Sequence, residues 1–326
     1  MIDPLKIEEV RKLDCQEIIN DMFDSGKYSP GTIELAQITM HAIFKGAVEN
    51  DYLLKNPAQG LLMRRTEEKE ERRVLSTDEE EIFRTYASGT MYDYAYFLAL
   101  ETGLRQGEIG GLKWEDIDFE HKTILVNRTL LQEPSKGGFH FGTPKTRTSR
   151  RTIPLTNAAV EILKQQSVKQ TKLMARSRNW DQNWVGLVFT TVNGKPVGNS
   201  TFREMMMKII KNINIDRKAE AKDGTFEEFR HAYMHALRHT FATRCIESGM
   251  QPKVLQKIMG HSTLSVTMDL YVHVSEDMGH SEIAKLEKAR QDYKEGIQNK
   301  YESRGKIVVL SRSAPGHMKA LKAYRR

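Results

Sequence analysis

The chain has 326 residues, which is long enough for two domains. It carries 50 Lys and Arg against 43 Asp and Glu, so its formal net charge is +7, and this balance favours a polyanionic partner such as nucleic acid. The two cysteines, Cys15 and Cys245, are too few for a disulfide framework or a zinc site of several thiolates. No signal peptide opens the chain and no apolar run approaches the about 18 residues of a membrane span, so we expect a cytoplasmic protein without a membrane partner.

Residues 1–64 are predicted to form a small helical domain. Apolar residues recur at helical spacing over residues 14–23 and again over residues 32–50. Ser29-Pro30 is a start signal for the second of these helices, because proline suits the first helical turn. Two packed helices are therefore expected before the first domain boundary.

The stretch from Arg64 to Arg73 contains no apolar side chain. Such a charged run is typical of a solvated connection between domains. We therefore assign residues 65–75 to a linker, residues 76–290 to a second domain, and residues 291–326 to the end of a C-terminal helix and a basic tail.

The second domain is predicted to be mainly α with a small antiparallel β-sheet, an α+β fold. Helical periodicity is clear at residues 91–101, 158–175 and 200–213. Alternating or β-branched segments predict strands at residues 122–130, 139–141 and 151–155.

His235 and Arg238 are three residues apart, so on a helix they share one face. A guanidinium group can bind two oxygens of an anion, and an imidazole can accept or donate a proton. Taken alone, the pair also fits a structural histidine beside a surface arginine. His231, His235 and His239 recur at the four-residue spacing of metal ligands on a helix, but the cation at Arg238 opposes a metal there, and we expect none.

Four further residues indicate a functional site only when they are considered together. Arg105 follows a Thr-Gly-Leu turn, and Lys145 begins a basic segment of the kind that contacts phosphates. His261 projects from a tight turn, because Gly260 closes one helix before another starts. Tyr271 follows; a tyrosine, whose ordinary pKa is about 10, is a poor nucleophile unless cations and imidazoles surround it. Singly, each of these residues fits a packing or surface role.

In this order the motifs resemble the tyrosine recombinases of the phage-integrase type. The resemblance extends from about residue 14 to about residue 285 and is sharpest at residues 102–108, 235–243 and 259–273. It implies a tyrosine recombinase catalytic fold preceded by a short helical core-binding domain. In the family that first unit normally has one or two more helices, so we expect Met1 to mark a shortened or alternative start.

The resemblance implies the catalytic residues Arg105, Lys145, His235, Arg238, His261 and Tyr271. The two arginines would bind the nonbridging oxygens of the scissile phosphate, and the tyrosine would form a 3′-phosphotyrosyl bond. The lysine would protonate the departing 5′-oxygen, the first histidine would assist proton transfer, and the second would hydrogen-bond the phosphate. Glu108 would support the arginines. The phosphotyrosyl bond keeps the energy of the broken phosphodiester, so no cofactor, metal or ATP is expected.

The resemblance also implies partners and a setting. The expected partners are double-stranded DNA at core recombination sites, further copies of the chain in a tetramer formed through residues 281–301, and an excision or directionality factor. The expected function is the integration and excision of a phage or other mobile element by a nucleoid-associated enzyme. A chromosome-dimer resolvase, a type IB-like topoisomerase and an accessory protein with impaired catalysis are the alternatives.

Overall fold

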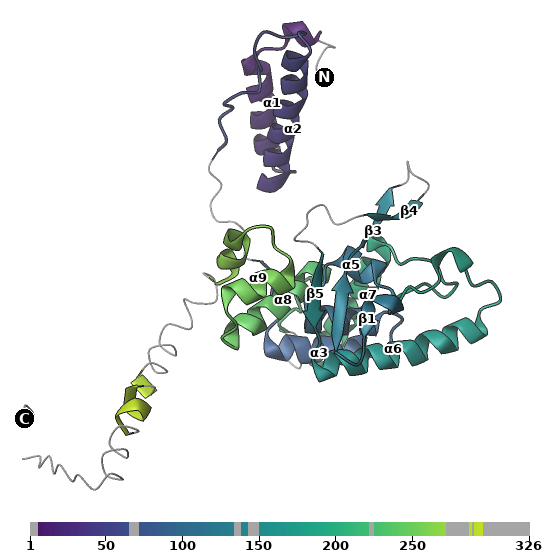
Figure 1. Ribbon diagram of the computed structural model, residues 1–326. Coiled ribbons are helices and arrows are strands. Elements are labelled where there is room, and N and C mark those ends of the chain that lie inside the picture. The colour runs from purple at the N-terminus through teal and green to yellow at the C-terminus, as the bar shows by residue number, and fades with distance from the viewer. Residues whose placement is uncertain are drawn as a thin grey trace, which may run out of the picture. The chain divides into compact units, whose positions relative to one another are not determined.

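The computed structural model describes residues 6–64, 72–133, 138–142, 150–221, 225–271, 287–288 and 290–295. The chain divides into two compact units, Met1–Glu71 and Arg72–Arg326 (Figure 1). Within the described part of the chain, no helix is both long and apolar enough to cross a membrane.

The first unit is built on two helices, α1 (Lys12–Asp24) and α2 (Pro30–Glu49), after a short 3-10 turn η1 (Ile7–Glu9). The hydroxyl of Ser29 accepts a hydrogen bond from the Thr32 amide, and proline occupies the first turn of α2. The helices lie side by side around a small core of five buried residues: Cys15, Ile19, Ile33, Ala58 and Leu61. The helix pair expected from the apolar periodicity is confirmed.

The second unit is mostly helical. Its longer helices are α3 (Thr77–Ala87), α4 (Asp93–Thr102), α6 (Asn157–Arg176), α7 (Asn199–Glu220) and α8 (Met234–Glu247). Two short helices, α5 (Gln106–Gly111) and α9 (Pro252–Met259), lie near the candidate site, and residues 264–271 form a further helical segment.

The strands form two separate antiparallel groups. β1 (Ile117–Asp118), β2 (Thr123–Val126) and β5 (Arg151–Pro154) make a three-stranded sheet in the order β1-β2-β5. β3 (Thr129–Glu133) and β4 (Gly138–Gly142) pair as a two-stranded ribbon. The mainly α fold with small antiparallel sheets is thereby confirmed.

The expected single strand over residues 122–130 is wrong, because the chain breaks between β2 and β3 at Asn127 and Arg128. Both side chains bond the buried carboxylate of Asp116, at 3.0 Å from Asn127 Nδ2 and 2.5 Å from Arg128 Nη1. These two polar residues therefore leave the strand to satisfy a buried charge, and the chain enters a different ribbon.

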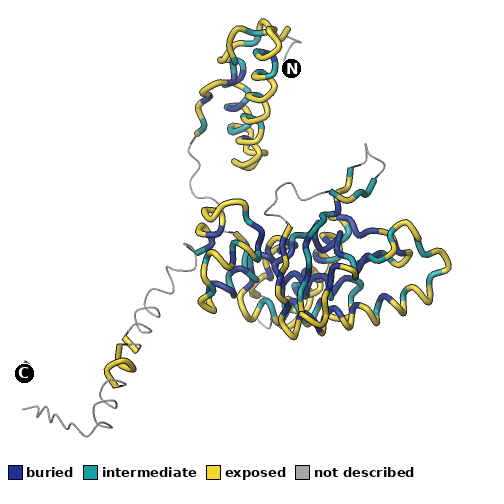
Figure 2. The backbone as a smooth tube through the Cα atoms, in the orientation of Figure 1, coloured by how far each residue is buried: buried dark blue, intermediate teal, exposed yellow. Residues whose placement is uncertain are grey.

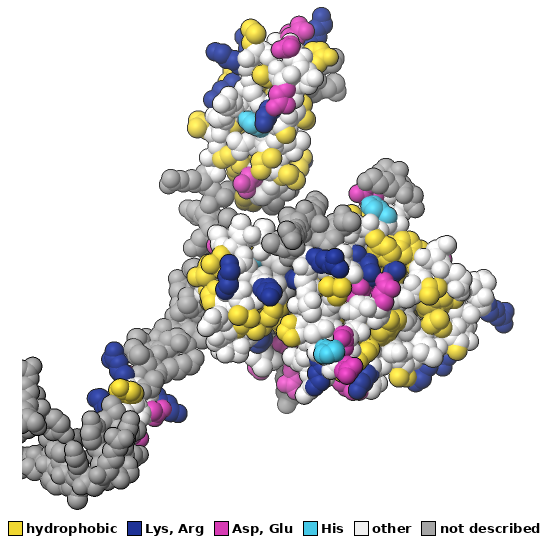
Figure 3. All heavy atoms as spheres, viewed as in Figure 1, with side chains coloured by type: hydrophobic (Ala, Val, Ile, Leu, Met, Phe, Trp, Pro, Cys, Tyr) yellow, Lys and Arg dark blue, Asp and Glu magenta, His cyan; other side chains and the backbone are white. Residues whose placement is uncertain are grey.

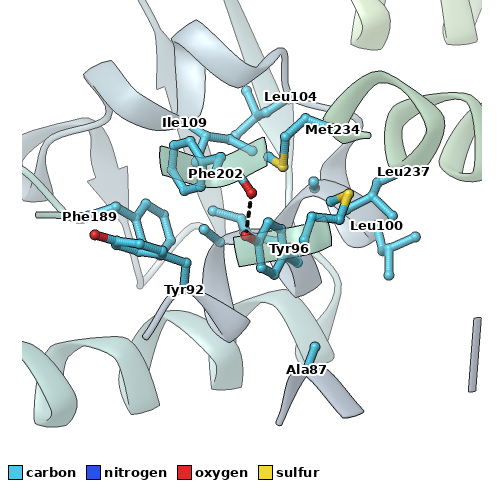
Figure 4. Packing of buried hydrophobic residues seen from close by; sticks show 14 of the residues in the cluster. Ala87, Tyr92, Tyr96, Leu100, Leu104, Ile109, Phe189, Phe202, Met234 and Leu237 are labelled. Atoms are coloured by element: carbon cyan, nitrogen blue, oxygen red, sulfur yellow. Dashed lines mark hydrogen bonds between the residues drawn. The ribbon is translucent and has the colours of Figure 1, made fainter. Parts of the chain in front are cut away.

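The main core lies between helices and sheet, where Figure 2 shows buried backbone running through the middle of the second unit. Tyr96 is fully buried and donates its hydroxyl to the carbonyl of Phe202 at 2.8 Å, as Figure 4 shows. Its ring also meets Phe83 and Phe202 edge to face. A second apolar cluster contains Ala242, Cys245, Ile246, Leu255, Met259 and Leu270. Helix α8 contributes to both clusters, and this fixes its polar residues relative to the turns that follow α4 and α9.

Candidate active site

The turn after α4 positions Arg105. Gly103 ends the helix in the left-handed region at φ 62°, and a Cβ there would lie 2.5 Å from the ring of Phe241 and 2.9 Å from the sulfur of Met259. Only glycine fits this combination of backbone angle and close packing. The turn delivers Arg105 to the N-cap of α5, where its side chain is 36% exposed.

Glu108 binds both the backbone and the side chain of Arg105. Its carboxylate accepts the Arg105 backbone N–H at 2.8 Å and the Arg105 Nη1 at 3.0 Å. The other terminal nitrogen of Arg105, Nη2, donates to the carbonyl of Gly260 at 2.9 Å, which is 155 residues away in the chain. Arg105 thus joins the start of α5 to the end of α9.

A second arginine reaches Glu108 from β5. Arg151 donates Nη1 and Nη2 to the two carboxylate oxygens at 2.8 and 2.9 Å, in a bidentate pair whose side chains are 2% and 7% exposed. Burial opposes ionisation of Glu108, but the hydrogen bonds and charge of Arg151, followed by those of Arg105, outweigh burial and hold the pKa of the carboxyl below its usual value. Glu108 is therefore ionised at neutral pH.

Arg238 lies on α8 and is 3% exposed. It donates Nη1 to the carbonyl of Gly103 and Nη2 to the carbonyl of Met259, the latter at 2.5 Å. Burial, followed by the charges of Arg105 and Arg151, lowers the pKa of Arg238 to about 9, so its guanidinium stays protonated at pH 7. Three guanidinium groups thus surround one carboxylate, and the excess positive charge suits an anion.

The two expected histidines both favour the neutral state. His261 Nδ1 lies 2.9 Å from the hydroxyl of Thr267, a fully buried side chain. Burial and the charges of Arg238 and Arg105 lower the pKa of His261 to about 4. Partial burial of the His235 ring, helped by the same two arginines, lowers the pKa of His235 below its usual value. With Nδ1 of His261 accepting from Thr267, the Nε2–H of that ring can donate to a phosphate oxygen.

Tyr271 does not join this network in the structure. Its hydroxyl donates to the backbone carbonyl of Met250, and its ring packs on the cluster that contains Cys245. Burial, followed by Cys245, raises the pKa of Tyr271 above its usual value. The structure therefore brings together Arg105, Arg238 and the two histidines, and holds the tyrosine hydroxyl on another contact. Lys145 lies outside the described residues.

Sequence reasoning missed Arg151 and Thr267 as members of the site. A signal for Arg151 exists in the alternation of its strand, because Arg151 and Ile153 point inward while Thr152 and Pro154 point outward. A charged residue on the inward face of a strand requires a buried partner. Thr267 gives no comparable signal, because its contact with His261, six residues earlier, depends on how the turn at His261 leads into the helical segment 264–271.

Comparison with known proteins shows the family of the chain. The model of the phage integrase family matches residues 64–278. The chain therefore belongs to the phage integrase family, whose members are tyrosine-type site-specific recombinases.

Two curated relatives cover most of the chain. It is 33% identical over 284 residues to a tyrosine recombinase XerC-like protein of Caldanaerobacter subterraneus subsp. tengcongensis, covering 83% of this chain and 69% of the relative. It is 28% identical over 297 residues to the transposase from transposon Tn916 of Enterococcus faecalis, covering 87% and 68%.

A solved structure of the Tn1549 transposon integrase in complex with transposon right end DNA is 28% identical. It aligns with a TM-score of 0.69 and covers 86% of this chain and 87% of that chain.

Proposed function

We propose that this recombinase cuts and rejoins DNA at core sites through a 3′-phosphotyrosyl bond to Tyr271, and that it integrates and excises a mobile element. The observation that carries the proposal is the cluster of Arg105, Arg151 and Arg238 around Glu108, in which Arg105 is the partly exposed member, with neutral His261 beside it. Such a fixed cationic cluster stabilises the negative charge of a pentacoordinate phosphate better than water does, since it needs no reorganisation during the reaction.

Arg105 and Arg238 are the proposed phosphate ligands. Arg105 is the more accessible, with its side chain 36% exposed, and would meet the phosphate first. Arg238 uses two of its five N–H donors on the carbonyls of Gly103 and Met259 among the described residues, which leaves donors for a nonbridging oxygen. Lys and Arg side chains also lie along the part of the second unit that Figure 1 labels α9, β5 and α5, as Figure 3 shows, and would follow the DNA backbone.

Proton transfers are assigned to the remaining residues. The Tyr271 oxygen forms the bond to phosphorus while the bond from phosphorus to the 5′-oxygen breaks. Neutral His235 would accept the tyrosine proton, and Lys145 would supply a proton to the departing 5′-oxygen. His261 would donate Nε2–H to the phosphate. Before attack, the hydroxyl of Tyr271 must leave the carbonyl of Met250.

The mobile-element role is supported by the similarity to the Tn916 transposase and the Tn1549 integrase. The similarity to a XerC-like recombinase supports the second candidate, resolution of chromosome dimers. In either role we propose that residues 1–64 contact the core site, that residues 65–75 connect this domain to a catalytic domain at 76–290, and that protomers form a tetramer through the C-terminal segment. An excision factor and a nucleoid location belong to the same proposal.

One capture experiment tests these assignments. The purified protein is incubated with lightly nicked genomic fragments from its natural source, denatured in detergent, and the DNA that remains linked to protein is sequenced. We expect covalent capture by the wild type and none by Tyr271→Phe. Captured DNA that maps beside the gene of this protein indicates a mobile element. Captured DNA that maps to one distant chromosomal locus indicates a resolvase.

Failure of the wild type to capture any sequence above the background of a control without protein would overturn the enzymatic proposal. Equal capture by Tyr271→Phe would show that another residue is the nucleophile. Covalent capture followed by relaxation of the DNA, without strand exchange between two duplexes, would favour the topoisomerase alternative.

A further inference from the structure

Arg151 links three separate elements through one buried side chain. It begins β5, its carboxylate partner Glu108 lies on α5, and its Nε donates to the carbonyl of Ile258 on α9 at 2.6 Å. All three of its side-chain nitrogens, Nε, Nη1 and Nη2, donate to protein acceptors. Its influence on the reaction must therefore pass through its neighbours.

The contacts of Arg151 close a ring that contains Arg105. Arg151 binds both oxygens of Glu108, and Glu108 binds the backbone and the Nη1 of Arg105. Arg105 in turn donates to Gly260, and the α-carbon of Gly260 sits so close to Arg151 that a Cβ there would lie 2.9 Å from its Nη1. The direction in which Arg105 points is thus set by a carboxylate that Arg151 orients.

We propose that Arg151 is a positioning residue for DNA strand cleavage: it fixes the Glu108 carboxylate, which aims the Arg105 guanidinium at the scissile phosphate. This inference rests on the proposed function. It adds a residue that never touches the substrate but on which one of the phosphate ligands depends.

Because Glu108 is ionised, the proposed positioning role of Arg151 has a pH dependence that can be measured. The groups that act on the carboxyl are Arg105 on its own helix, Arg151 on β5, and Arg238 and His235 on α8. Without Arg151, burial would push the pKa of Glu108 upward against the weaker pull of Arg105. A protonated Glu108 would offer fewer acceptor sites to Arg105 and would release it.

The test uses single-turnover rates of covalent adduct formation as a function of pH, on a nicked duplex that the wild type captures. Arg151→Met should slow adduct formation by on the order of a hundredfold at neutral pH, since a small misplacement of a binding group has effects of that size. Its rate should also rise with pH through a titration that the wild type lacks. Arg151→Lys keeps the charge but not the bidentate geometry, so it should be slower than the wild type without the added titration.

Two further variants separate positioning from folding. The double variant Glu108→Gln with Arg151→Met removes both buried charges, and it should be slow at all pH values without the added titration. Arg84→Met removes an arginine paired with Glu80 and Glu101 on the surface of the same unit, and should cleave like the wild type.

Each outcome decides the inference. If Arg151→Met cleaves at the wild-type rate with the wild-type pH profile, Arg151 has no positioning role. If Arg151→Met does not fold, a folded double variant that cleaves at the wild-type rate overturns the inference equally well. If the wild type itself forms no adduct, the proposed function fails first, and this result is distinct from a defect confined to the Arg151 variants.

Discussion

Replacing Gly260 by alanine would test how rigidly the guanidinium cluster is held. Gly260 ends α9 in the left-handed region at φ 63°, and an added Cβ would lie 2.9 to 3.1 Å from three atoms of Arg151. A long side chain could normally move away from such a contact. Arg151 cannot do so without loss, because it is tied to Glu108 and to the carbonyl of Ile258.

Gly249 offers a matched control for the backbone part of the cost. It follows α8 at φ 81°, and nothing lies within 4 Å of its added Cβ. Alanine at either position should lose about 1–2 kcal/mol of stability from the left-handed backbone alone. Gly260→Ala should lose a further amount of about 1.5–3 kcal/mol, the worth of one hydrogen bond to a charged group.

Urea unfolding followed by tryptophan fluorescence measures this difference. The chain has three tryptophans, Trp114, Trp180 and Trp184, and all lie in the second unit, so the signal reports on that unit alone. We expect Gly260→Ala to unfold at clearly lower urea than Gly249→Ala, and to form covalent adducts more slowly. Equal loss of stability in the two variants would refute the claim that Arg151 is fixed in place.

Three other predictions can be tested by measuring unfolding in the same way. Thr267→Val keeps the side-chain shape but leaves Nδ1 of His261 without its hydroxyl partner, so stability should fall by about 1–3 kcal/mol and adduct formation should slow, whereas Thr267→Ser should retain both. The pKa values of His261 and His239 are each lowered to about 4, so the folded state resists their protonation; stability should be full above pH 6.5 and should fall as pH drops from 6.5 towards 4, and a flat urea midpoint over that range would contradict the assignment. Tyr96→Phe should cost about 1–2 kcal/mol in the same unfolding assay, because the Phe202 carbonyl loses its buried donor; no loss would mean that water replaces the hydroxyl.

Features encoded over a few residues were predicted well from the sequence. The start of α2 at Ser29-Pro30 and the end of α9 at Gly260 are confirmed, because capping and glycine conformations are local. The strand break at Asn127 was missed, since it depends on a bond to Asp116, which lies on a separate element. Periodicity reports which residues face inward, and it carries no information about the partner that a polar residue finds there.

The candidate site shows the same limit at longer range. The spacing of His235 and Arg238 predicts a shared helix face, and both lie on α8. The sequence also predicted cationic groups around Tyr271, whereas the hydroxyl lies on the Met250 carbonyl. A hydroxyl can donate a hydrogen bond to any nearby carbonyl. The sequence motif therefore does not reveal which acceptor the Tyr271 hydroxyl uses in the absence of DNA. The hydrogen bonds of Arg151 and Arg105 to Glu108, Ile258 and Gly260 span separations of 43, 107 and 155 residues, which no local pattern encodes.

Arg238 has a consequence for how this protein can be altered by mutation or by evolution. Its two terminal nitrogens join the carbonyl end of α4 to the carbonyl end of α9, so the side chain proposed to meet the phosphate also closes the scaffold. Replacing Arg238 should therefore lower the stability of the fold as well as remove a proposed phosphate ligand, so a loss of activity at this position would have two causes. Changing Tyr271, the proposed nucleophile, should disturb the fold less, because its hydroxyl makes a single hydrogen bond among the described residues.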